Sequence, residues 1–272
     1  MNFNVDKFHK IANHIRGVAL TLAHNVNESH SAGAMSMADI LAVLYSEYVD
    51  VEAIKANSPK RDRVILSKGH CCASLYAMLA EVGIMDKDEL MEKFAQNGTI
   101  YFAHASHQLP GVELSTGSLG HGLPVACGMA LGAKKSGLNF KVYCIVGDGE
   151  MNEGSNWEAI MFAAQHKLDN LCLIIDKNQM QALGDTKDIL CLDPMPEKLA
   201  AFGWDVEDID GNDIEDVISA FECFKHHRSG KPFVMVANTI KGKGVSFMEH
   251  NLKFHYSAPK DDELKQALEE LA

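Results

Sequence analysis

The sequence predicts an α/β fold in which a parallel sheet is covered by helices on both faces. Short, continuously apolar runs alternate along the chain with longer segments of helical periodicity. A strand that is apolar at consecutive positions is buried on both faces, which is typical of parallel sheets. At 272 residues the chain can bury one large core, and no internal repeat or linker divides it. We therefore expect a single domain over residues 1–272.

The expected elements follow from periodicity and composition. Near the start, Phe8, Ile11, Ile15, Val18 and Leu22 have the spacing of an amphipathic helix. Strands are expected at 64–66, 142–146, 171–175, 204–209 and 233–238, where apolar residues run together. Helices are expected at 73–82, at the Ala- and Gly-rich stretch 123–135, and at 155–167, 197–202, 213–228 and 261–271.

Composition and charge argue against several classes of partner. The chain has 25 basic and 37 acidic residues, and this net charge of −12 disfavours nucleic acid and anionic membranes as main partners. No apolar run approaches the roughly 18 residues of a membrane span, and the N-terminus does not resemble a targeting peptide. Seven cysteines without a Cys-x-x-Cys pair indicate reduced thiols. We expect a cytoplasmic protein.

Polar groups follow two consecutive apolar runs in the middle of the chain. Gly147-Asp148-Gly149 follows the first run, and Asn178 follows the second. The Asp148 carboxylate, the Asn178 amide oxygen and a backbone carbonyl that we place at Met180 form a predicted ligand set for Mg²⁺, which Ca²⁺ or Mn²⁺ could replace. The glycines leave backbone N–H groups able to approach phosphates. The alternative for Gly-Asp-Gly alone is a plain turn.

The segment from Gly147 to Asn178 resembles the thiamine diphosphate fingerprint, and three further segments resemble parts of transketolases. These are Ser67-Lys68-Gly69-His70, LPGVELSTGSLGHG at 109–122 and TIKGKG at 239–244. The resemblance extends over nearly the whole chain and is greatest to the amino-terminal subunit of split transketolases, in which two chains form the enzyme. It implies a transferase of carbohydrate metabolism, such as the pentose phosphate reactions, that moves a two-carbon ketol unit from a ketose phosphate to an aldose.

The resemblance also implies roles for individual residues. His30, His104 and His255 are implied to be catalytic, through proton transfer and oxyanion stabilisation. Glu153 is implied to face the partner chain and to join a proton relay. The residues implied to bind the cofactor are His70, Gly117, Ser118, Leu119, Gly149, Glu153, Asn178, Lys241 and His255. For any one histidine the alternative is a surface or hydrogen-bonded side chain.

A second chain is implied as well. In transketolases a further domain supplies the glutamate that protonates the cofactor's pyrimidine ring, together with most groups that hold the substrate phosphate. This sequence has no length for the pyrimidine-binding and C-terminal domains. We therefore expect that the partner is a C-terminal transketolase subunit, in a heterotetramer with two of each chain, and that the isolated chain has no activity.

Departures from the family pattern surround the substrate channel. His104-Ala105-Ser106-His107 stands where relatives have a different sequence, His121 replaces a usual glutamine and Phe254 replaces a tryptophan. A specialised transketolase for a branched, deoxy or sulfonated ketose phosphate is therefore one alternative. A second is the alpha subunit of a 2-oxo acid dehydrogenase, which shares the fingerprint, although 109–122 and 239–244 disfavour it. A third is a non-enzymatic cofactor-binding subunit.

Overall fold

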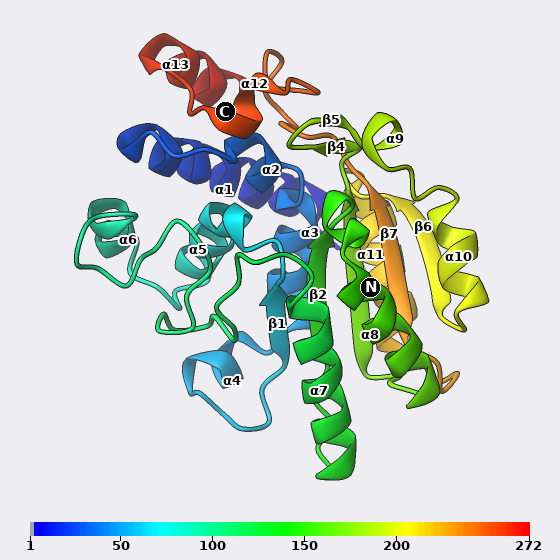
Figure 1. Ribbon diagram of the computed structural model, residues 1–272. Coiled ribbons are helices and arrows are strands. Elements are labelled where there is room, and N and C mark those ends of the chain that lie inside the picture. The colour runs from blue at the N-terminus through cyan, green and yellow to red at the C-terminus, as the bar shows by residue number, and fades with distance from the viewer. Residues whose placement is uncertain (1–2) are drawn as a thin grey trace.

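The main strands form one parallel sheet with the order β1-β2-β3-β7-β6 (Figure 1). The computed structural model describes residues 3–272. The strands of this sheet are β1 Arg63–Leu66, β2 Val142–Gly147, β3 Leu171–Lys177, β6 Asp205–Asp210 and β7 Phe233–Asn238. A small antiparallel hairpin, β4 Met180–Gln181 and β5 Gly184–Asp185, follows β3. The predicted parallel sheet is confirmed, and every predicted strand forms.

Helices cover both faces of this sheet (Figure 1). One face carries α1 Val5–Val26, α3 Ala38–Val43, α5 Cys72–Glu81 and α11 Ile214–Lys225. The other carries α7 Gly122–Lys135, α8 Gly154–Gln165 and α10 Met195–Ala201. The remaining helices are α2 Ser31–Met35, α4 Val51–Lys55, α6 Lys87–Lys93, α9 Thr186–Ile189, α12 Lys253–Tyr256 and α13 Asp261–Glu270. Single turns are formed by Leu44–Tyr48, which is π-helical, and by Gly69–Cys71 and Gly149–Asn152, which are 3-10.

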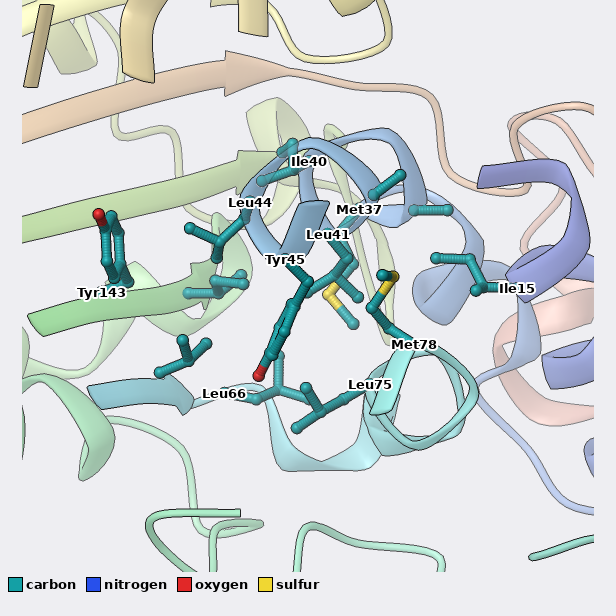
Figure 2. Close-up of a cluster of buried hydrophobic side chains, with 14 of the residues drawn as sticks. Ile15, Met37, Ile40, Leu41, Leu44, Tyr45, Leu66, Leu75, Met78 and Tyr143 are labelled. Atoms are coloured by element: carbon teal, nitrogen blue, oxygen red, sulfur yellow. The ribbon is translucent and has the colours of Figure 1, made fainter. Parts of the chain in front are cut away.

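The strands are apolar throughout because they fill two cores at once. Successive side chains of a strand point to opposite faces of the sheet. In β2, Tyr143 and Ile145 pack with the helices of the first face, whereas Cys144 and Val146 pack with those of the second. Figure 2 shows part of the first core, in which side chains of α3 and α5 surround Tyr45 beside the strands. Burial on both faces explains why the sequence pattern there is continuous.

The register of the strands gathers their carboxyl ends at one edge of the sheet. Gly147 of β2 pairs with Asp176 of β3, and Asp176 pairs with Ala237 of β7. The loops that follow β1, β2, β3 and β7 therefore start close together. The segment around α12 meets the loop after β7, since the Lys241 ammonium donates to Nδ1 of His255 at 2.7 Å. It also meets the start of α2, since the backbone N–H of His30 donates to the carbonyl of His255 at 3.0 Å. In residues 3–272 no helix is both long and apolar enough to cross a membrane.

Candidate active site

A cavity of about 320 Å³ lies at the carboxyl edge of the sheet. Ligands of parallel α/β sheets bind at this edge. The walls come from the start of α2, from the loops after β1, β2, β3 and β7, from the segment between α6 and α7, and from α12. The lining residues are His30, Gly33, Lys68, His70, His104, Gly117, Leu119, Gly147, Asp148, Gly149, Glu150, Asn178, Met180, Gln181, Ala182, Lys241 and His255.

The structure brings most of the predicted site residues to this cavity. These are His30, His70, His104, Gly117, Leu119, Asp148, Gly149, Asn178, Met180, Lys241 and His255. Ser118 and Glu153 are exposed and do not line it, so their roles stay predictions. Lys68 and Glu150 line it as well, although no role was predicted for either.

A buried ion pair connects four segments beneath the cavity. The Lys68 ammonium donates to the carboxylate of Asp176 and to the carbonyl of Gly33 at 3.0 Å. Asp176 also accepts from the hydroxyls of Ser36, at 2.6 Å, and Thr239. Burial opposes both charges, but their mutual attraction outweighs it, so that the pKa of Lys68 is raised and the pKa of Asp176 is lowered. The pair thereby fixes α2 and the ends of β1, β3 and β7 relative to one another.

The predicted metal ligands supply oxygen atoms of the kind that Mg²⁺ prefers. The buried Asp148 carboxylate accepts from the backbone N–H of Gln179 at 2.7 Å and of Gly149 at 2.8 Å. Burial, and then the neighbouring Asp176, raise the pKa of Asp148 to about 6. A divalent cation would offset this unfavourable charge. In the described residues no three His, Cys, Asp or Glu side chains form a metal cluster.

The backbone N–H groups of Gly147 and Gly149 are bonded to nearby carboxylates, and Gly117 allows close packing. The N–H of Gly147 donates to Glu150 at 3.2 Å, and that of Gly149 donates to Asp148. The expectation that these backbone N–H groups approach a phosphate stays a prediction. A Cβ at Gly117 would lie 2.8 Å from the His104 ring. Glycine at 117 thus allows His104 to pack against the main chain.

Lys241 is a cation available at the edge of the predicted metal site. Its ammonium donates to the carbonyl of Met180 at 3.3 Å and to Nδ1 of His255 at 2.7 Å. Burial lowers the pKa of Lys241 to about 8, and the nearby Lys68 adds to this effect. Both hydrogen-bond partners are neutral acceptors, so that an anionic ligand would stabilise the charge that Lys241 carries at neutral pH.

Three histidine rings lie against one another at the cavity. The ring of His30 lies 4.9 Å from that of His70 and 5.0 Å from that of His255. Burial, reinforced by the neighbouring positive groups, lowers the pKa of His30 and His70 to about 4 and of His255 to about 3. The pKa of His104 is lowered as well, mainly by burial. These imidazoles are neutral at pH 7 and can each donate or accept a proton.

The backbone at His30 is held in an unusual conformation. His30 has φ 67°, in the left-handed region that non-glycine residues rarely adopt. Its Nδ1 lies 2.7 Å from the Ser29 hydroxyl, and its N–H is bonded to the carbonyl of His255. Strain of this kind costs about 1–3 kcal/mol and tends to occur at functional sites. The surrounding contacts keep the imidazole directed into the cavity.

Three charged residues of the site had no predicted role. Lys68, Glu150 and Asp176 each lie directly beside an apolar strand or a Gly-Asp-Gly turn. A charged residue at such a position indicates a buried ion pair or hydrogen bond, because a charge that is buried needs a partner. The partner itself cannot be found from one sequence, since Lys68 meets Asp176 across 108 positions and Ser67 meets Glu150 across 83.

The fold and the site define a class: α/β domains with a ligand cavity at the carboxyl edge of a parallel sheet. The family model described as "Transketolase, thiamine diphosphate binding domain" matches residues 7–272. The chain therefore belongs to the transketolase family and is its thiamine-diphosphate-binding part. This match favours transketolase over the alpha subunit of a 2-oxo acid dehydrogenase.

Relatives of similar length cover almost the whole chain. It is 45% identical over 271 residues to one of the subunits of the apulose-4-phosphate transketolase of Actinobacillus succinogenes, covering 99% of this chain and 98% of the relative. It is 40% identical over 261 residues to the 6-deoxy-6-sulfo-D-fructose transketolase subunit SqwG of a Clostridium species, covering 96% and 94%. The crystal structure of transketolase from Campylobacter jejuni superposes with a TM-score of 0.90 at 32% identity. This chain covers 43% of that longer chain.

Proposed function

We propose that this chain is the cofactor-holding subunit of a two-chain transketolase. With a C-terminal subunit it would transfer a two-carbon ketol unit from a ketose phosphate to an aldose. One observation carries the proposal: a single cavity contains the oxygen ligands of Asp148 and Asn178, the cation of Lys241 and a group of neutral histidines. The first set suits a metal and a diphosphate, and the histidines suit a polyhydroxylated substrate.

The residues of the cavity would have different roles, according to their chemistry. Asp148, Asn178 and the Met180 carbonyl would hold Mg²⁺, while Lys241 and His70 would bind the diphosphate. Residues 117–119 would contact the aminopyrimidine. When bound, thiamine diphosphate supplies the carbon that forms a bond to the ketose and stabilises the resulting negative charge.

The remaining histidines would act on the sugar. His30, His104 and His255 lie at the same cavity, and burial keeps their imidazoles neutral. A neutral imidazole can donate its N–H to a carbonyl or hydroxyl oxygen and can accept a proton from a hydroxyl. Because a neutral ring also lacks charge repulsion toward Lys241, the cavity can combine these histidines with a cation.

A partner chain would complete the site. The relatives of matching length are named as subunits, and this chain covers less than half of the solved transketolase. We infer a heterotetramer with two of each chain. Its cytoplasmic location is supported by seven cysteines that are all free thiols. Co-expression with the C-terminal subunit, followed by native mass spectrometry, should show a complex with two copies of each, and robust turnover by the isolated chain would overturn the proposal.

The identity of the ketose substrate is a separate part of the proposal. Ordinary pentose phosphates are the first candidate, and an unusual ketose phosphate is the second, favoured by the departures at His107 and His121. His107 Nδ1 lies 2.7 Å from the Ser115 hydroxyl, and His121 Nδ1 lies 3.0 Å from the carbonyl of Leu119. Relatives are named for apulose 4-phosphate and for 6-deoxy-6-sulfo-D-fructose. Steady-state rates of the complex with these two ketoses and with xylulose 5-phosphate will decide between the candidates.

A further inference from the structure

A buried glutamate that follows Gly-Asp-Gly holds three loops of the site together. Glu150 is 2% exposed and belongs to the turn between β2 and α8. Its Oε1 accepts the N–H of Gly120 at 3.0 Å and the hydroxyl of Ser67. Its Oε2 accepts the N–H of Gly147 at 3.2 Å. Both oxygens of the carboxylate are therefore acceptors, and neither position suits a donor.

The three donors belong to segments with different proposed tasks. Ser67 begins the loop after β1 that carries Lys68 and His70. Gly120 directly follows residues 117–119, which would contact the aminopyrimidine. Gly147 begins the loop that would hold the metal and the diphosphate. The Glu150 carboxylate thus bonds both to the segment beside the proposed aminopyrimidine contact and to the loop proposed for the metal and the diphosphate. Glu150 also lines the cavity.

The surroundings leave the 117–122 segment little freedom. Gly120 has φ 80°, and a Cβ there would lie 2.5 Å from the Ser155 hydroxyl, which donates to the carbonyl of Gly120 at 2.6 Å. A Cβ at Gly122 would lie 2.4 Å from the Ser67 hydroxyl, which accepts the N–H of Gly122 at 3.0 Å. The segment is therefore pressed against the β1 loop and the start of α8, with Glu150 bonded to its centre.

We propose that Glu150 is a positioning residue that sets the distance between the aminopyrimidine segment and the diphosphate loop. This inference rests on the proposed function. Glutamine has nearly the shape of glutamate, but one of its two terminal groups is a donor. That group would face the N–H of Gly147 or the donors from Gly120 and Ser67, so that buried donors would be left unpaired. The aminopyrimidine segment and the diphosphate loop would then shift relative to each other.

The test compares a ligand that would contact both the aminopyrimidine segment and the diphosphate loop with a ligand that would contact the diphosphate loop alone. Thiamine diphosphate and inorganic pyrophosphate, each with Mg²⁺, are titrated calorimetrically into the complex with the C-terminal subunit. Glu150→Gln is expected to weaken thiamine diphosphate binding about 10-fold or more while pyrophosphate binds as before, in line with the effect of supporting residues on metal sites. Glu158→Gln, on the exposed surface of α8, removes the same charge and should change neither affinity.

The outcomes separate the two proposals. Equal losses for both ligands, or unchanged thiamine diphosphate binding, would overturn the positioning role of Glu150. An unmodified complex that binds neither ligand would instead overturn the proposed function. Thermal unfolding shows whether each variant folds. If Glu150→Gln does not, Ser67→Ala removes one of the three donors and should give a smaller loss that is again selective for thiamine diphosphate.

Discussion

The inner side of the cavity and the outer side, which is the exposed surface beside it, are built in different ways. On the inner side, Lys68 and Asp176 are buried and bond to each other and to neighbouring loops. On the outer side, beyond the residues that line the cavity, Ser118, His121 and Glu153 are exposed. The difference teaches that the inner side is held by contacts within this chain, whereas the outer side has few such contacts and is the surface that the proposed partner chain would meet.

The largest expected effect comes from breaking the inner ion pair. Asp176→Ala leaves the Lys68 ammonium buried without a counter-charge, and we expect a loss of about 3–5 kcal/mol in the free energy of unfolding. Urea unfolding monitored by circular dichroism measures it. Replacing both residues together, by Lys68→Met and Asp176→Leu, should recover most of the stability. An unchanged unfolding midpoint for Asp176→Ala would show that the pair does not support the inner side.

The next effect separates ligand binding from stability within the inner side. Asp148→Asn removes a charge that burial opposes, but it also turns a donor towards the N–H of Gly149 or Gln179. Because these two effects oppose each other, we expect the unfolding free energy at pH 7 to change by less than about 2 kcal/mol. Removing the carboxylate should nevertheless weaken Mg²⁺-dependent binding of thiamine diphosphate by roughly 100-fold. Calorimetric titration checks the affinity and urea unfolding checks the stability. Normal binding by this variant would contradict the metal assignment.

A smaller effect is expected on the outer side, and only in the complex. Glu153→Gln should change the unfolding free energy of the isolated chain by less than about 0.5 kcal/mol, since the side chain is exposed. If Glu153 contributes to proton transfer with the partner, turnover by the complex should fall about 10-fold or more. Steady-state kinetics of the complex measures this. The same loss from Glu158→Gln would show that the effect is not specific to position 153.

The effect that is smallest at neutral pH, where both rings are neutral, concerns protonation of His30 and His70. The folded-state pKa of His30 and His70 lies near 4, below the ordinary value of 6.5. As the pH falls from about 6.5 towards 4, the unfolded chain therefore binds protons before the folded chain does. The free energy of unfolding decreases over this pH range. Nuclear magnetic resonance titration should place both midpoints near 4. The double variant His30→Asn, His70→Asn should show a weaker decline in stability over that range than the unmodified chain.

Much of this fold follows from local patterns, and part of the site does not. The runs of β2, β3 and β7 were predictable because each must be apolar on two faces. Helices α3 and α4 were not predicted, since α3 is buried on all sides and α4 is only five residues long. The metal ligands were predicted from the polar groups that follow two apolar runs, and the histidine roles were predicted by resemblance. The roles of Glu150 and Asp176 depend on partners far away in the sequence, which one sequence does not reveal.

The backbone hydrogen bond between His30 and His255 has a consequence for when the cavity forms during folding. Its two ends are separated by most of the chain, and the sheet itself joins β3 to β7 across intervening helices. Contacts between distant positions form late, because a long loop must close first. During synthesis the cavity therefore cannot take shape until the segment around His255 has left the ribosome. Until then, the turn at His30 lacks its hydrogen bond to His255 and keeps only its contacts with nearby residues such as Ser29.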